Sequence, residues 1–220
     1  TEVEKLSNIE VEGVYTHFSS ADSDFEYTNK QIEIFNKGVE KIKNRINTVK
    51  YVHCSASNGI LNFDVDTCNM VRAGILMYGY RASDTTFDKI DLRPVTRLKS
   101  KISFIKELDE GMSISYGRRF ITDKKMKIAT IGIGYADGIR RSLSNRGYVV
   151  IHGKKCKILG SVCMDSFMVD VSDVLVSVGD EVFIWDNDII KLEDIAKLYD
   201  TINYEVISCI SDRVPRVFVD

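Results

Sequence analysis

The chain has 220 residues, 44% of them hydrophobic and 28% charged, which supports one large or two small packed domains and excludes a disordered chain. Thirty basic and 32 acidic side chains give a net charge of -2, which argues against nucleic acid as a partner. No apolar run approaches the roughly 18 residues of a membrane span. The five cysteines are an odd number without a C-x-x-C pair, so we expect neither a disulfide framework nor a metal site. These features predict a globular, cytoplasmic protein that is neither exported nor anchored to a membrane.

The first ninety residues alternate strand and helix signals, as parallel strands joined by helical crossovers do. Residues 12–18 are predicted to form a buried strand. Ser23 and Glu26 form an S-x-x-E capping box, and apolar residues at 32, 35, 39 and 42 predict one face of a helix over 24–45. Residues 49–53 are predicted as a second strand and 71–76 as a third, with a helix between them.

From about residue 92 the sequence changes to short apolar segments broken by turn residues, which is typical of an antiparallel β domain. We place the boundary near 91–94 and expect domains over 1–91 and 92–220. The predicted strands cover 127–135, 148–151, 155–159, 162–171, 181–185 and 217–219, and the second and third of these form a hairpin. Residues 192–199 are the only helix expected in this half.

Several polar and aromatic residues are candidates for a site, although no single spacing is a catalytic signature. Residues 132–138 (GIGYADG) resemble a phosphate loop, but a strand-end turn is the better interpretation, because no long helix follows. His17 and His53 each close a predicted parallel strand, where such folds place their sites, and a structural histidine is an equally good reading of each. Arg72 lies in an apolar run and must be paired if it is buried. By position alone, Tyr116 and Tyr204 are surface or half-buried aromatic residues.

Together, six segments at these positions resemble alanine racemase in order and at similar intervals. They are GVYTHF at 13–18, RAGI at 72–75 with Tyr78 and Gly79, SYG at 115–117, IGYADG at 133–138, VCMD at 162–165 and TINYE at 201–205. The resemblance covers nearly the whole chain. It implies an α/β plus mainly β architecture, in which the C-terminal part of a pyridoxal 5′-phosphate-binding (β/α)8 barrel precedes an antiparallel β domain.

The resemblance further implies an isomerase that interconverts L-alanine and D-alanine for peptidoglycan, as a homodimer with active sites shared between subunits. Because a full barrel takes roughly 250 residues, about 150 residues of it are expected to lie outside this chain. They would include the lysine that forms a Schiff base with the cofactor and an arginine near the substrate carboxylate. A start at Thr1 rather than Met also suggests a piece of a longer protein. We expect this chain alone to be inactive.

Matched residue by residue, Tyr116 resembles the catalytic tyrosine that exchanges the Cα proton on one face of the substrate. Arg72 resembles the residue that faces the pyridine nitrogen, where an always-charged guanidinium donates a hydrogen bond and leaves the nitrogen unprotonated. His17 matches the residue that pairs with this arginine and orients it.

The remaining matches concern the cofactor phosphate and the substrate entrance. The resemblance implies that the phosphate is bound by the Ser57 hydroxyl, the backbone N–H groups of Gly74 and Ile75, and the Tyr204 hydroxyl. Tyr135 and Met164 match residues that the β domain contributes to the substrate entrance of the partner subunit. One departure from the family is Ala56, which precedes Ser57 where asparagine is common.

Two alternatives remain open. The first is a serine racemase of the type associated with glycopeptide resistance, and Tyr204 favours alanine over serine because a smaller residue would better admit a hydroxymethyl group. The second is a non-catalytic, incomplete fragment. Retention of Tyr116, Arg72, His17 and Tyr204 argues against decay, whereas the missing lysine argues for incompleteness.

Overall fold

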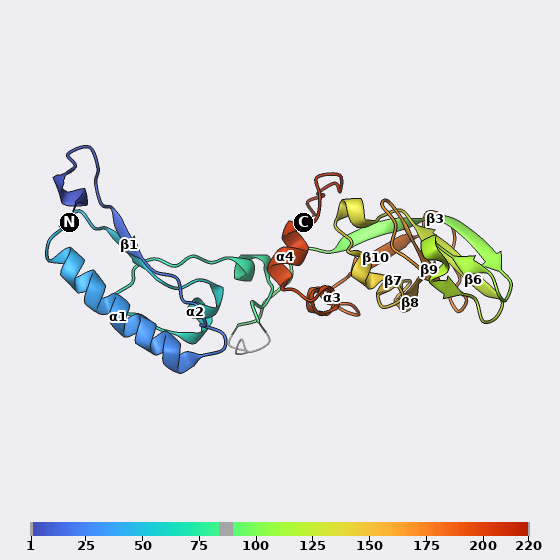
Figure 1. The fold of residues 1–220 in the computed structure, drawn as a ribbon, viewed down its shortest axis with the longest axis horizontal. Coiled ribbons are helices and arrows are strands. Elements are labelled where there is room, and N and C mark those ends of the chain that lie inside the picture. The colour runs from blue at the N-terminus through green and yellow to red at the C-terminus, as the bar shows by residue number, and fades with distance from the viewer. Residues whose placement is uncertain (1, 84–89, 220) are drawn as a thin grey trace. The chain divides into compact units, whose positions relative to one another are not determined.

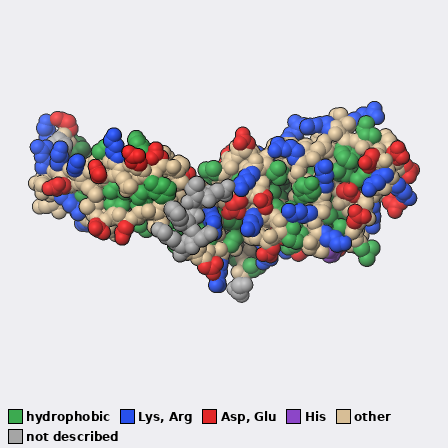
Figure 2. Space-filling model, turned by 90° about the horizontal axis from the view of Figure 1, so that it is seen from below, with side chains coloured by type: hydrophobic (Ala, Val, Ile, Leu, Met, Phe, Trp, Pro, Cys, Tyr) green, Lys and Arg blue, Asp and Glu red, His purple; other side chains and the backbone are tan. Residues whose placement is uncertain are grey.

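The computed structural model describes residues 2–83 and 90–219, and the chain divides into two compact units, Thr1–Pro94 and Val95–Asp220 (Figure 1). Figure 2 shows acidic and basic side chains interspersed over the visible face of each unit. Among the residues described, no helix combines the length and the apolar character needed to cross a membrane.

The first unit is built around a β–α–β element. Strands β1 (Gly13–Tyr15) and β2 (Tyr51–His53) pair in parallel, with Val14 opposite Val52, and helix α1 (Phe25–Lys43) connects them. Helix α2 (Ser57–Asn62) follows β2, and short 3-10 helices cover Val3–Lys5 and Ile75–Tyr78. The expected alternation of parallel strands and helices is therefore confirmed, with shorter strands than predicted.

Helix α1 packs its apolar face on strand β2. Phe35 and Val39 share one buried cluster with Val52 and Cys54, and Ile32 packs against its edge. Asp24 is the N-cap, and its carboxylate accepts a hydrogen bond of 2.9 Å from the Tyr27 N–H. The predicted capping box at Ser23 is therefore wrong by one residue, because the Ser23 side chain bonds instead to Asp22.

We expect Asp24→Ala to lower the free energy of unfolding of the first unit by about 1 kcal/mol, because the Tyr27 N–H loses its acceptor. Urea unfolding followed by circular dichroism measures the change. Ser23→Ala is the matched control and should have a small effect. If Ser23→Ala lowered the free energy of unfolding more than Asp24→Ala, Ser23 would be the N-cap instead.

The strand predicted over 71–76 does not form. The backbone N–H of Arg72 bonds to the Ser55 carbonyl at 3.0 Å, but the N–H of Gly74 bonds to the Ser57 hydroxyl, and a 3-10 helix begins at Ile75. The Gly74 N–H therefore bonds to a side chain, whereas in a strand it would bond to the backbone of a neighbouring strand. The segment passes the end of β2 instead of extending the sheet.

The second unit is a closed barrel of six antiparallel strands in the order β10-β3-β6-β9-β8-β7. These strands are β3 (Leu98–Leu108), β6 (Met126–Ile131), β7 (Tyr148–Ile151), β8 (Lys154–Leu159), β9 (Phe167–Asp170) and β10 (Glu181–Trp185). A smaller pair, β4 (Ser113–Ile114) and β5 (Phe120–Ile121), lies outside the barrel sheet. Short 3-10 helices cover Tyr116–Arg118, Tyr135–Asp137 and Arg141–Leu143. The antiparallel β domain expected from the sequence is confirmed.

The barrel closes around apolar side chains. Ile131, Ile158, Phe167, Val182 and Ile184 are each almost completely buried. The predicted hairpin is confirmed, since β7 and β8 pair across a two-residue turn in which His152 and Gly153 both have positive φ. That combination matches the right-handed twist of the two strands.

Two expectations for the C-terminal segment are wrong. Helix α3 (Leu192–Tyr199) forms as predicted, but a second helix, α4 (Asn203–Ser208), follows it. Six residues are too few to display helical periodicity in the sequence. Residues 217–219 form no strand, and Phe218 is 97% exposed, because no neighbouring strand offers them a ladder. The strand expected over 162–171 is confined to β9.

Candidate functional site

The side chain of Arg72 is the centre of a polar cluster at the carboxyl ends of β1 and β2. One of its terminal nitrogens, Nη2, donates to the Thr16 carbonyl at 2.9 Å and lies 3.2 Å from His17 Nδ1. The other, Nη1, contacts His53 Nδ1, and Nη2 also lies 3.3 Å from the Cys54 carbonyl oxygen. The acceptors that hold this guanidinium therefore lie at the end of β2 and in the residues that directly follow β1 and β2.

Aromatic rings complete the cluster. The Tyr15 and His53 rings stack with centroids 5.3 Å apart and an angle of 8° between planes. The Arg72 guanidinium lies 5.5 Å from the centre of the Tyr15 ring, within the range of a cation–π interaction. These contacts restrict both the rotation of Arg72 and the tilt of the His53 ring.

Because Arg72 can only donate, a hydrogen bond to either histidine requires the ring to accept at Nδ1. Burial lowers the pKa of His53, and the positive charge of Arg72 lowers it further. The contact between Arg72 and His17 agrees with the pairing expected from the sequence. His53 is an additional partner of Arg72. The sequence did not indicate this contact, because a histidine at the end of a strand can equally well be structural.

We expect the stability of the first unit to depend on pH through His53. Its pKa is lowered in the folded state relative to about 6.5 in the unfolded chain, so the unfolded state binds the proton more tightly. The His53 contribution is complete above pH 6.5 and is lost as the pH falls through the lowered value. Urea unfolding at pH 7.5 and pH 5 measures the loss. His53→Gln, which does not titrate, should flatten the dependence, and an unchanged slope would contradict this assignment.

Ser57 and Gly74 approach each other beside the Arg72 cluster within the first unit. Ser57 is 1% exposed at the start of α2, and its hydroxyl accepts a 3.3 Å hydrogen bond from the Gly74 N–H. Ile75, the next residue, is buried and begins a 3-10 helix. Ala56 is the N-cap of α2 and provides no side-chain capping bond. A hydroxyl and a backbone N–H thus lie within one hydrogen bond of each other.

Tyr116 projects from the second unit on a turn of unusual backbone geometry. Its ring is 76% exposed, and its neighbours Ser115 and Gly117 both have positive φ. The Ser115 hydroxyl donates to the Ser161 carbonyl at 2.7 Å, and the Ser161 hydroxyl donates to the Tyr116 carbonyl at 3.0 Å. A Cβ on Gly160 would lie 2.6 Å from the Ile114 carbonyl oxygen, so only glycine permits this approach. The reciprocal serine pair fixes the backbone that carries the exposed ring.

Tyr135 and Met164 are brought together by backbone hydrogen bonds. The N–H of Tyr135 donates to the Cys163 carbonyl, and the N–H of Ala136 donates to the Met164 carbonyl, both at 2.9 Å. A Cβ on Gly134 would lie 2.4 Å from the Cys163 carbonyl oxygen, so the sequence IGYADG needs glycine here for close contact between two loops. Both side chains remain accessible, at 44% for Tyr135 and 57% for Met164.

Tyr204 lies on α4, which is tied to the segment after Tyr135 by an ionic contact. Arg140 binds Glu205, the residue next to Tyr204, and also donates to the Tyr199 carbonyl at 3.2 Å. A hydrogen bond from Thr201, followed by the charge of Arg140, lowers the pKa of Glu205. The contact between Arg140 and Glu205 therefore fixes the position of the Tyr204 backbone relative to the loop of Tyr135. These two charged residues were not singled out in the sequence.

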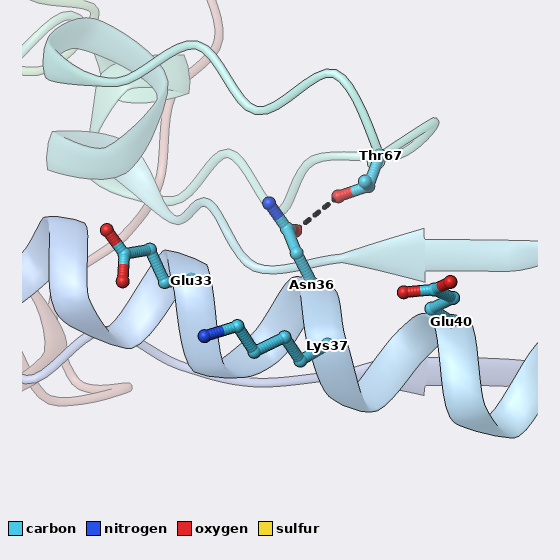
Figure 3. Close-up of a pocket in the computed structure, with 5 residues that line it drawn as sticks. All are labelled: Glu33, Asn36, Lys37, Glu40 and Thr67. Atoms are coloured by element: carbon cyan, nitrogen blue, oxygen red, sulfur yellow. Dashed lines mark hydrogen bonds between the residues drawn. The ribbon is translucent and has the colours of Figure 1, made fainter.

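Two cavities of the described residues lie away from these clusters. One, of about 470 Å³, lies between α1 and the loop before Cys68 and is lined by Glu33, Asn36, Lys37, Glu40 and Thr67 (Figure 3). Charged side chains of a solvated helix face line most of it, which is not the lining of a small-molecule site. Within the described residues, no group of three or more His, Cys, Asp or Glu side chains could hold a metal ion.

The candidate residues thus form two sets, one in each unit. His17, Arg72, Ser57, Gly74 and Ile75 belong to the unit with parallel strands, whereas Tyr116, Tyr135, Met164 and Tyr204 belong to the barrel unit. This combination of a parallel β–α–β unit with a histidine-held arginine and a β-barrel unit with exposed tyrosines has a known counterpart. The family model "Alanine racemase, N-terminal domain" matches residues 1–82, and "Alanine racemase, C-terminal domain" matches residues 95–218. The chain belongs to the alanine racemase family.

Curated and solved relatives agree. An alanine racemase of Halothermothrix orenii is 43% identical over 221 residues, covering 98% of this chain and 58% of the relative. Alanine racemase of Clostridium difficile 630 in complex with cycloserine is 42% identical, with a TM-score of 0.90 over 97% of this chain and 57% of that one. Alanine racemase of Bartonella henselae with covalently bound pyridoxal phosphate is 29% identical, with a TM-score of 0.84 over 96% and 57%. The chain therefore spans somewhat more than half the length of these relatives.

Proposed function

We propose that this chain contributes to an alanine racemase, an isomerase that interconverts L-alanine and D-alanine with pyridoxal 5′-phosphate and supplies D-alanine for peptidoglycan. The observation that carries the proposal is the Arg72 guanidinium, which is held by two histidine rings and two carbonyls at the carboxyl ends of parallel strands. The named relatives support the same reaction. Five free cysteines are consistent with a reducing compartment such as the cytoplasm.

The residues present fit pyridoxal 5′-phosphate. A pyridine nitrogen that stays unprotonated needs a donor that keeps its own proton, and Arg72 is such a donor. A phosphate accepts hydrogen bonds from several donors at once, and the Ser57 hydroxyl and the Gly74 N–H already lie within one hydrogen bond of each other. A phosphate oxygen could take the place of the bond between these two groups. When bound, the cofactor would withdraw electrons from the substrate and make its Cα–H acidic.

We propose that Tyr116 exchanges the Cα proton at its phenolic oxygen. The Ser115 and Ser161 hydroxyls hold its backbone while the ring stays accessible, which is the arrangement a proton-transfer residue needs. Arg72 would contact the pyridine nitrogen, with His17 and His53 orienting it. Ser57, Gly74, Ile75 and Tyr204 would bind the phosphate.

The barrel unit would also shape substrate access. We propose that Tyr135 and Met164, joined by the hydrogen bonds of their backbones, line the substrate entrance of a partner subunit in a homodimer. Their accessible side chains and fixed backbones support this role. The candidate residues are divided between two units, and a dimer with shared sites would allow each active site to draw on both subunits.

Alanine is the proposed substrate, with serine as the alternative. Tyr204 is a large side chain on a helix that the contact of Arg140 with Glu205 holds in place, which favours the smaller methyl group. A site that makes no hydrogen bond to the serine hydroxyl discriminates between alanine and serine by about a hundredfold at most.

The test uses the complete enzyme saturated with cofactor. Chiral chromatography would measure D-alanine from L-alanine and D-serine from L-serine, and we expect kcat/KM for alanine to exceed that for serine by about tenfold or more. Tyr204→Ala should raise the relative rate with serine. A preference for serine would establish the alternative, and cofactor binding without racemisation of either amino acid would establish a non-catalytic protein.

A further inference from the structure

Two thiols in the first unit lie in contact and have no part in the proposed reaction. The sulfur atoms of Cys54 and Cys68 are 3.3 Å apart. Cys54 is fully buried at the end of β2 in the cluster formed with α1, whereas Cys68 is partly exposed on the loop that leads to Arg72. A protected thiol and an accessible thiol therefore meet at one point.

The surrounding hydrogen bonds hold the loop of Cys68 in this position from both sides. On one side, the Thr67 hydroxyl donates to the Asn36 side chain of α1 at 2.6 Å (Figure 3). On the other, the Asn69 side chain accepts from the Val52 N–H at 2.9 Å and donates to the Lys50 carbonyl at 2.7 Å. The Asn69 side chain thus bonds to backbone groups along the edge of β2, as a neighbouring strand would. Its contacts fix the position of Cys68 beside Cys54.

We propose that Cys54 and Cys68 form an oxidation site, which a low-molecular-weight disulfide of the glutathione class converts to an intramolecular disulfide. A disulfide bond is about 2.05 Å long, so each sulfur needs to move by only about 0.6 Å from the observed 3.3 Å. Cys68 lies on a loop and can make this movement. The site goes beyond the proposed racemase activity and does not depend on it.

The reaction balances in two exchange steps. The Cys68 thiolate attacks one sulfur of the small disulfide, which breaks that bond and releases one thiol. Cys54 then gives up its proton and attacks the Cys68 sulfur, which releases the second thiol. The two protein thiols are oxidised, the small disulfide is reduced to two thiols, and the two protons end on those thiols. Burial, followed by the contact with Cys68, raises the pKa of Cys54 to about 11, so the partly exposed Cys68 is the thiol that meets the oxidant first.

The crosslink would lie directly beside the proposed cofactor contacts. The Cys54 carbonyl oxygen is 3.3 Å from Arg72 Nη2, and the Arg72 N–H bonds to the carbonyl of the next residue, Ser55. Oxidation would therefore join the two segments that place the Arg72 backbone and side chain. Since the bond closes a loop of the chain, we also expect it to raise the melting temperature of the first unit by several degrees.

The sequence permits a direct test on the full chain. Trypsin would release residues 51–72 as one peptide that holds both cysteines and no others, and residues 198–213 as a peptide that holds only Cys209. The chain is incubated at a series of ratios of glutathione to glutathione disulfide, denatured, alkylated and digested. We expect peptide 51–72 to take two alkyl groups when reduced, and when oxidised to take none and be lighter by two hydrogen atoms than the free dithiol.

Exposed Cys209 is the internal control, because a single accessible thiol can form only a mixed disulfide. In a Cys54→Ser variant, Cys68 should stop at the mixed disulfide with glutathione. In a Cys68→Ser variant, buried Cys54 should remain a thiol and take one alkyl group. The proposal is overturned if wild-type peptide 51–72 still takes two alkyl groups, or only carries glutathione, at ratios that fully modify Cys209.

Discussion

Mixing two inactive variants of the complete enzyme should restore about a quarter of the wild-type activity. One variant is Tyr116→Phe, which removes the phenolic oxygen proposed to exchange the Cα proton. The other replaces the lysine expected to form the Schiff base with the cofactor. Loss of a proton-transfer group lowers kcat by about a hundred- to ten-thousand-fold, so each homodimer should be nearly inactive.

The recovery follows from the proposed sharing of sites between subunits. After full exchange of equal amounts, half of the dimers are mixed, and one of their two sites carries both defects while the other carries neither. Chiral chromatography of D-alanine measures the activity, and mass spectrometry under native conditions verifies exchange. If Tyr116 acts within its own chain, every site keeps one defect and mixing restores nothing, which would also remove the partner roles proposed for Tyr135 and Met164.

Tyr148→Phe is the matched control for this experiment. Tyr148 lies on β7 of the same barrel unit and is also exposed, at 41%, but it carries none of the serine contacts that hold the Tyr116 turn. We expect its variant to retain full activity. A similar loss in both variants would indicate that the barrel unit tolerates no tyrosine replacement, rather than a role for one phenol.

Replacing Arg72 should change both the rate and the products of the complete enzyme. In Arg72→Glu, a carboxylate replaces the donor that contacts two histidine rings and two carbonyls, so the pyridine nitrogen could bind a proton. We expect racemisation to fall on the order of a hundredfold, because the preorganised charge that we propose to face the cofactor ring is lost. Transfer of the amino group to the cofactor should rise relative to racemisation, because a protonated ring withdraws electrons more strongly.

The variant Arg72→Lys separates the effect of the positive charge from the effect of the planar guanidinium geometry. Lysine keeps a positive charge but cannot match the two-sided geometry of a guanidinium, so we expect a lower rate with little change in the ratio of products. Pyruvate and D-alanine are measured in the same reaction, and thermal unfolding checks that each variant is folded. An unchanged product ratio in Arg72→Glu, with the fold intact, would limit Arg72 to a structural role.

The sequence alone determined that a segment of alternating strands and helices precedes an antiparallel β domain in this chain. Apolar spacing predicted α1, the local residue pattern predicted α3, and two short apolar segments flanking residues 152–154 predicted the β7–β8 hairpin, because these signals depend on neighbours in the chain. The six motifs indicated the family and its candidate residues by resemblance. The apolar run around Arg72 also indicated that this residue needs partners if it is buried, since a guanidinium cannot lose its charge.

The resemblance indicated His17 as one of these partners, and only the tertiary structure decided the others. His53 ends a different strand from the one that precedes His17, and the parallel pairing of β1 with β2 brings both rings to Arg72. The segment at 71–76 looked like a strand, but bonds to Ser55 and Ser57 replaced its ladder. Likewise, Cys54 and Cys68 are 14 positions apart, and their contact depends on how Asn69 borders β2. Contacts of this kind depend on distance in space, which local propensity does not encode.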